Sequence, residues 1–156
     1  MRILGVDFGR RRIGLAVSDE SATLARPWQT IEAGTSPTAS ADRIVGLLDR
    51  ERRATLDDFV VGGFVVGLPR RLNGDDTNGT AGARALATAL GARTGLPVHL
   101  QDERLTSREA ESILALREPD WRARKAQLDA TAAALVLQDF LDTPAPVRRD
   151  DQSGDQ

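Results

Sequence analysis

The first eighteen residues contain two segments in which apolar residues alternate, joined by a short polar turn. Leu4 and Val6 share one face of the segment 2–8, and residues 12–18 repeat the same period of two. This period is typical of a β-strand with one buried face. Because Gly9 and three arginines separate the two segments, the pattern predicts a β-hairpin at the start of a sheet.

The periodicities further along the chain predict helices that alternate with strands. The Gly62-Gly63 pair interrupts one apolar, β-branched run and predicts a bulge there. The order strand, strand, helix, strand, helix, strand, helix, helix predicts an α/β fold with a mixed sheet and helices packed on it. After a polar loop at 34–40, the predicted helices are 41–53, 80–93, 107–117 and 124–142, and the predicted strands are 59–66 and 98–101.

Length and composition indicate one globular domain. The 156 residues are enough for a single core, and 40% of them are hydrophobic. We expect the domain to span residues 1–142 and the polar, Pro-containing segment 143–156 to be disordered. No apolar run is long enough for a membrane span. Because Asp7 interrupts the region where a signal peptide needs apolar residues, a cytoplasmic protein is expected.

The chain lacks cysteine and has a single histidine, His99. This excludes disulfides, thiolate zinc sites and a cysteine nucleophile, and a Ser-His-Asp hydrolase would depend on His99 alone. Any chemistry is therefore expected to use carboxylates. The net charge of -2 gives no basic surplus, so a nucleic-acid interface would have to come from local clusters.

Three carboxylates stand at unusual positions. Asp7 lies within the first apolar strand, where a charge is costly unless it is paired or binds a cation; the alternative is an aspartate that caps a turn. Glu103 follows the strand 98–101, at the edge of an α/β sheet that favours ligand sites. The alternative for Glu103 is a solvated turn with a weak ion pair.

Asp129 is the most informative of the three. At 100° per residue, it falls on the same helix face as Ala132, Ala133 and Val136, which is the face directed to the core. A metal ion or a partner cation such as Arg104 would stabilise this carboxylate. The alternative is an aspartate in the first turn of a helix that begins near residue 127, stabilised by the helix dipole.

An oxygen-only set made of Asp7, Glu103 and Asp129 suits Mg²⁺ or Mn²⁺. Two such ions can activate a water molecule and stabilise the leaving oxygen of a phosphodiester. Asp19 and Asp102 are further carboxylates that could add a ligand.

Four motifs in the chain resemble those of the YqgF (RuvX) family, in the family's order and over about residues 2–142. They are VDFGRRRIGLAVSD at 6–19, VVGLP at 65–69, DERLTS at 102–107 and DATAAALVL at 129–137. The resemblance implies a ribonuclease H-like fold related to Holliday-junction resolvases. It also implies a role in maturation of the 5′ end of precursor 16S rRNA, and it places the family's acidic positions on Asp7, Glu103 and Asp129.

The chain departs from the family pattern at two positions. Arg11 stands where the family often has lysine, which keeps the charge. Asn73 stands near a common aspartate, so no metal role is assigned to it.

Three basic clusters lie next to the motifs and predict a track for the phosphate backbone. They would make salt-sensitive contacts with little base recognition, because aromatic residues are only 4% of the chain. The partner expected from the resemblance is precursor rRNA, with branched DNA as an alternative and ribosomal precursor particles as a further partner. The predicted nucleic-acid-binding residues are Arg10, Arg11, Arg12, Arg70, Arg71, Arg124 and Lys125.

Two other classes of function remain open at this point. The segment Asp7-Phe8-Gly9 also resembles the phosphate motif of actin-like ATPases and sugar kinases, but these need a second lobe for which 156 residues are too few. A non-catalytic nucleic-acid-binding ribosome-assembly factor is the other alternative, and the presence of all three carboxylates argues against it.

Overall fold

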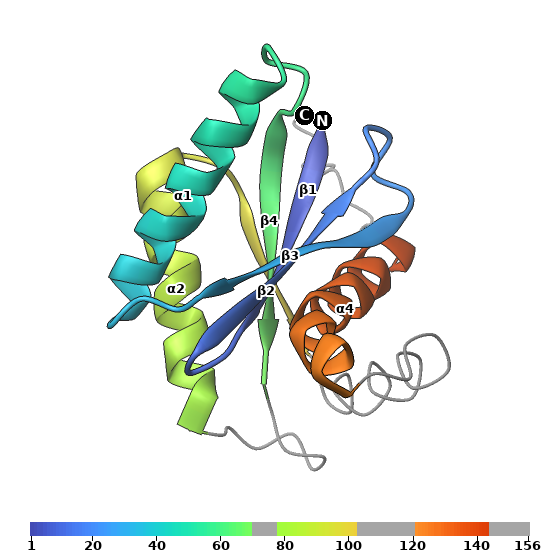
Figure 1. Ribbon diagram of the computed structural model, residues 1–156. Helices are drawn as coiled ribbons and strands as arrows, with labels where there is room; N and C mark the ends of the chain where they lie inside the picture. Colours follow the sequence, from blue (N-terminus) through green and yellow to red (C-terminus); the bar gives the residue numbers. More distant parts are fainter. Residues whose placement is uncertain (70–77, 103–120, 144–156) are drawn as a thin grey trace, which may run out of the picture.

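A computed structural model of the chain describes residues 1–69, 78–102 and 121–143 (Figure 1). These residues form five strands and three helices. The elements are β1 (Arg2–Phe8), β2 (Arg12–Ser18), β3 (Ala25–Glu32), α1 (Pro37–Ala54), β4 (Val61–Leu68), α2 (Asn78–Thr94), β5 (Val98–Asp102) and α4 (Trp121–Asp142).

The strands form one mixed sheet in the order β3-β2-β1-β4-β5. β1 and β2 are the predicted antiparallel hairpin, and β3 continues it as a third antiparallel strand. β4 and β5 run parallel to β1. This is the sheet of a ribonuclease H-like fold, which confirms the predicted fold class. Because β1, β4 and β5 are parallel, their last residues lie at one edge of the sheet, here called the carboxyl edge (the lower edge in Figure 1).

Helices cover both faces of the sheet, with α1 and α2 on one face and α4 on the other (Figure 1). The alternation along β1 and β2 explains this layering, because each strand contributes side chains to both layers. The core on the α1 and α2 side includes Leu4, Ile13, Leu15, Ile44, Phe64, Val66, Leu86 and Leu90, and the core under α4 includes Ala16, Val65, Ala133, Val136 and Leu137.

The strand β3 was not predicted from the sequence. Charged residues and Pro27 interrupt its apolar pattern, and most of its side chains are exposed or half-buried. β3 is an edge strand, where a proline is tolerated because one side of the strand needs no ladder hydrogen bonds. The register also shifts between Leu15 and Ala16, and Pro27 pairs with Ala16 just after that shift.

The prediction that residues 34–40 form a loop was wrong in its second half. α1 begins at Pro37, not at residue 41. The hydroxyl of Ser36 accepts a hydrogen bond from the Ala39 amide at 3.1 Å, and a proline in the first turn has no amide hydrogen that needs a partner. The predicted strand 59–66 is shifted to Val61–Leu68.

The bulge expected at the paired glycines is present. Arg2 pairs with Val61 and Ile3 pairs with Gly63, so Gly62 is the extra residue. The predicted helix 107–117 and all but the first residue of the predicted tail 143–156 lie outside the described residues. Within the described part of the chain, no helix is long and apolar enough to cross a membrane.

Candidate functional site

Asp7 is the last residue but one of β1, the central strand, and it lies at the carboxyl edge. Its Cα partner on β2 is Gly14. Gly5, two residues earlier, points to α4, since a Cβ at Gly5 would meet the Leu137 Cβ at 2.8 Å. Side chains two residues apart share a face, so Asp7 also lies on the α4 face of the sheet.

α4 packs closely against this part of the sheet. A Cβ on Gly14 would fall 1.8 Å from the carbonyl oxygen of Asp129, so the backbones of β2 and α4 touch only because residue 14 is glycine. Gly14 is in turn the Cα partner of Asp7. The contact therefore brings Asp129 of α4 beside the strand pair that carries Asp7.

Asp129 lies on the sheet-facing side of its helix, as its spacing predicted. Ala130, Ala132 and Ala133 are buried around it. Because α4 begins at Trp121, Asp129 stands well inside the helix, and the alternative that placed it in a first turn was wrong.

The carboxylate of Asp129 pairs with Arg12, whose Nε lies 3.4 Å from Oδ2. Arg104, the other candidate partner in the sequence, lies outside the described residues. Burial raises the pKa of the Asp129 carboxyl, and the positive charge of Arg12 opposes that rise without cancelling it. Arg12 therefore offsets only part of the effect of burial on this pKa.

The third predicted carboxylate, Glu103, lies outside the described residues and directly follows Asp102, the last residue of β5. In the β4–β5 register, the Cα partner of Asp102 is Leu68, whose side chain belongs to the core on the α1 and α2 side. Cα partners direct their side chains to the same face of a sheet. The preceding residue, Gln101, points to α4 and donates a hydrogen bond to the Asp139 carboxylate at 2.7 Å. Asp102 thus lies at the carboxyl edge but on the face opposite Asp7 and Asp129.

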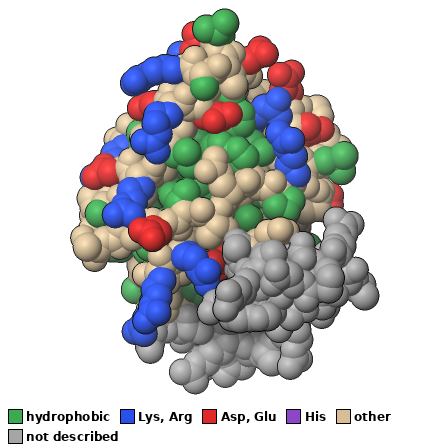
Figure 2. All heavy atoms as spheres, viewed as in Figure 1, with side chains coloured by type: hydrophobic (Ala, Val, Ile, Leu, Met, Phe, Trp, Pro, Cys, Tyr) green, Lys and Arg blue, Asp and Glu red, His purple; other side chains and the backbone are tan. Residues whose placement is uncertain are grey.

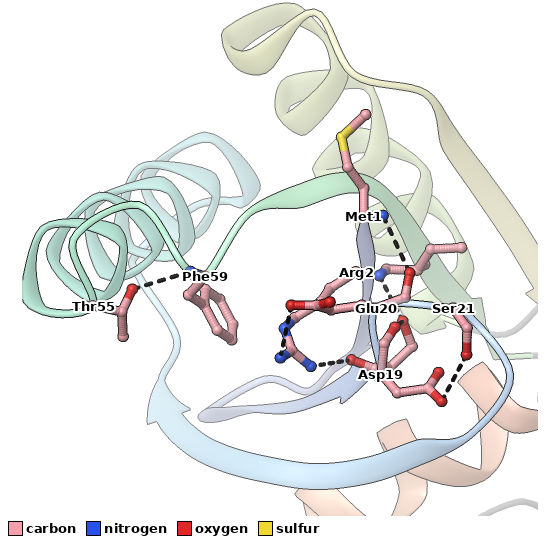
Figure 3. A network of polar contacts seen from close by, with 9 residues as sticks. Met1, Arg2, Asp19, Glu20, Ser21, Thr55 and Phe59 are labelled. Carbon is pink, nitrogen blue, oxygen red and sulfur yellow. Dashed lines mark hydrogen bonds and ion pairs between the residues drawn. The ribbon is translucent and has the colours of Figure 1, made fainter.

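Asp19 has a structural role at the other end of the sheet. Its Oδ1 accepts hydrogen bonds from the Thr23 and Leu24 amides at 2.7 and 3.2 Å, and Oδ2 accepts one from the Ser21 hydroxyl at 2.9 Å. These bonds lower the pKa of the Asp19 carboxyl, with the Thr23 amide as the main cause. Figure 3 shows this turn beside Arg2, at the start of β1 and far along the strand from Asp7.

The β1–β2 turn places three arginines at the carboxyl edge. Arg10 and Arg11 are exposed, whereas Arg12 is half-buried against Asp129. Figure 2 shows basic side chains gathered at the lower left, over the position of this hairpin in Figure 1. Arg70 and Arg71 lie outside the described residues, as do the side chains of Arg124 and Lys125, whose backbone belongs to α4.

The larger cavities do not coincide with the carboxylates. A cavity of about 460 Å³ is lined by Met1, Leu48 and Phe59 at the start of β1, far from Asp7. A second, of about 360 Å³, lies beside the hairpin and is lined by Phe8, Arg10 and Ser36, on the α1 and α2 side. Among the described residues, neither of these two cavities is lined by Asp7 or Asp129.

The donor chemistry of the two carboxylates fits a divalent cation. Asp7 and Asp129 offer only carboxylate oxygen atoms, which are the donors that Mg²⁺ and similar divalent cations prefer. In the part of the chain that the structure describes, no three potential ligands form a cluster. Of the three predicted ligands, Asp7 and Asp129 belong to the described residues and Glu103 does not.

The described strands and helices define a protein of the ribonuclease H-like class. The chain belongs to the RuvX family, whose model, described as Holliday junction resolvase, matches residues 1–143. The chain is therefore assigned to this family and not to the actin-like ATPases or sugar kinases, which the segment Asp7-Phe8-Gly9 also resembles.

Curated relatives match almost the whole chain. Proteins named "Putative pre-16S rRNA nuclease" include one from Anaeromyxobacter dehalogenans, 43% identical over 94% of this chain and 100% of the relative. The protein of that name from Pelotomaculum thermopropionicum is 39% identical over 96% of this chain and 92% of the relative.

Two solved structures are similar at low sequence identity. RuvC of T. thermophilus in complex with a Holliday junction substrate has a TM-score of 0.44 and 20% identity, over 90% of this chain and 93% of that one. The fowlpox virus Holliday junction resolvase has a TM-score of 0.49 and 11% identity, over 88% and 94% of the two chains.

Proposed function

We propose that this protein is a divalent-metal-dependent nuclease that matures the 5′ end of precursor 16S rRNA. The observation that carries the proposal is the backbone contact between Gly14 and Asp129, which brings the α4 segment that carries Asp129 beside the strand partner of Asp7, close to an arginine-rich turn. The name shared by relatives that cover nearly the whole chain supports the choice of substrate.

In this proposal, Asp7, Glu103 and Asp129 hold Mg²⁺ or Mn²⁺. When bound, such ions supply an activated water molecule and stabilise the charge on the leaving oxygen. The residues of the chain orient the scissile phosphate. Arg10 and Arg11 follow Asp7 within four residues and are exposed, so they contact the flanking phosphates and add affinity without reading the base sequence.

The family model favours a second substrate, because its description is Holliday junction resolvase. A four-way DNA junction also presents phosphates to an exposed surface, and the carboxylate chemistry would be the same. RNA and DNA substrates therefore have to be separated by experiment.

The decisive experiment compares cleavage of precursor 16S rRNA and of a four-way DNA junction, each with Mn²⁺ and with EDTA. We expect Mn²⁺-dependent cleavage of the rRNA precursor by the wild type. Asp7→Asn should abolish it, because the amide keeps the shape of the side chain but loses its charge. Glu20→Gln is the matched control, since Glu20 is exposed at the other end of the sheet and its loss should leave cleavage unchanged.

Three outcomes would contradict the proposal. Full activity of Asp7→Asn would show that Asp7 is not needed for catalysis and would refute the proposed site. Cleavage of the four-way junction alone would show that the substrate is branched DNA and not precursor rRNA. Tight RNA binding that is indifferent to Mn²⁺, without cleavage, would favour a non-catalytic assembly factor.

A further inference from the structure

Arg12 differs from its neighbours in the hairpin. It is the first residue of β2, and its side chain turns to the α4 face of the sheet, whereas Arg10 and Arg11 are exposed. The side chains of Arg12 and Asp129 are 39% and 29% exposed, so their ion pair is partly shielded from water but not sealed in the core. A pair with this exposure can open without unfolding any element.

The Arg12 contact uses a carboxylate oxygen that a metal ion would also need. The guanidinium Nε approaches Oδ2 of Asp129 at 3.4 Å, and both a guanidinium and a divalent cation bind a carboxylate through its oxygen lone pairs. A divalent ion brings twice the charge of Arg12 and binds the oxygen directly.

We propose that Arg12 is a displaceable counter-ion of Asp129, which leaves the carboxylate when a divalent cation binds and then becomes available to a phosphate of the substrate. The inference rests on the proposed function, since it assumes that Asp129 is a metal ligand. It adds a role for Arg12 that differs from those of Arg10 and Arg11. Because one arginine would serve Asp129 in the free protein and the substrate in the complex, metal and nucleic acid should bind with positive coupling.

The arrangement also explains why an arginine suits this position. The planar guanidinium matches a carboxylate and a phosphate equally well, so one side chain can exchange the first partner for the second. Arg12 and Asp7 lie on the two strands of one hairpin at the carboxyl edge. The released side chain therefore remains near the scissile phosphate.

The test measures Mn²⁺ affinity by titration calorimetry of the full chain, without nucleic acid. Arg12→Gln removes the competing charge and should bind Mn²⁺ about two- to fivefold more tightly, the factor expected from losing a partly exposed ion pair. Arg12→Lys keeps the charge and should bind like the wild type. Arg11→Gln, which removes an exposed charge from the same turn, should change the affinity less than Arg12→Gln.

A second measurement follows Arg12 itself. In ¹⁵N spectra recorded with the diamagnetic ion Mg²⁺, the Nε resonance of Arg12 should move on titration, and the same resonance should not move in Asp129→Asn. Unchanged or weaker Mn²⁺ binding by a folded Arg12→Gln, or an Arg12 resonance indifferent to Mg²⁺, would show that the pair is purely structural. If the wild type and Asp129→Asn bind Mn²⁺ alike, the proposed metal site fails as well.

Discussion

Gly14 of β2 and Asp129 of α4 are in backbone contact, and a methyl group on Gly14 would lie 1.8 Å from the Asp129 carbonyl oxygen. The two residues are far apart in sequence, and each is next to a different part of the candidate site. Gly14 pairs with Asp7 in the hairpin, and Asp129 pairs with Arg12. This one contact therefore fixes how closely the backbone of Asp129 approaches the hairpin that carries Asp7.

Gly14→Ala should separate β2 from α4 and impair the protein in two ways. The added methyl group cannot be accommodated without a shift of backbone, so we expect a loss of roughly 1–3 kcal/mol in the free energy of unfolding. Cleavage should fall by about 100-fold, because carboxylates displaced by about 1 Å no longer share a cation correctly. Urea unfolding and the Mn²⁺-dependent cleavage assay measure the two effects.

Gly46→Ala is the matched control for this variant. Gly46 lies within α1, and a Cβ there would meet nothing within 4 Å. Because alanine favours the helix, this variant should be stabilised by about 0.5–1 kcal/mol and keep its activity. Equal behaviour of the two variants would refute the role given to the Gly14 contact.

Asp129→Asn should stabilise the metal-free protein at neutral pH. Burial raises the pKa of the Asp129 carboxyl, so the folded chain binds the proton of this carboxyl more firmly than the unfolded chain does. Stability therefore falls as the pH rises from the unfolded pKa through the folded pKa, and stays lower above it. The variant has no such carboxyl. Its melting temperature should exceed that of the wild type at pH 7, and the difference should shrink as the pH is lowered through that window.

Asp19→Asn should show the opposite pH dependence. The Thr23 and Leu24 amides lower the pKa of the Asp19 carboxyl, so its contribution to stability is present above the unfolded pKa and is lost as the pH falls through the folded pKa. This variant should melt below the wild type at neutral pH and match it in acid. Thermal melts in EDTA across the pH range test both aspartates. A variant of Asp19 that melts above the wild type at pH 7 would contradict the capping role.

The sequence was sufficient to predict those parts of the fold that depend on local patterns. The hairpin, the bulge at Gly62 and the core-facing side of the last helix all follow from the period of the apolar residues. β3 could not be found in this way, because an edge strand buries too little to leave an alternating pattern. The start of α1 was signalled by Ser36 and Pro37, which the loop-like composition of residues 34–40 concealed.

The site could be predicted only one residue at a time. Asp7 and Asp129 attracted attention because a carboxylate among apolar residues is costly, and that cost can be seen in the sequence. The partner of Asp129 could not be seen, since its choice between Arg12 and Arg104 depends on how α4 crosses the sheet. The role of Gly14 could not be predicted either, because a close approach of two backbones leaves no periodic pattern in the sequence.

Arg11→Ala should weaken nucleic-acid binding without weakening the fold. The side chain of Arg11 is exposed, while its backbone carbonyl accepts a hydrogen bond from the Ala33 amide at 2.8 Å, which the substitution retains. A phosphate contact carries no base information, so affinity for all sequences should fall alike. The dependence of log affinity on log salt should flatten by about one unit or somewhat less. A lower melting temperature with an unchanged salt slope would instead make Arg11 a structural residue.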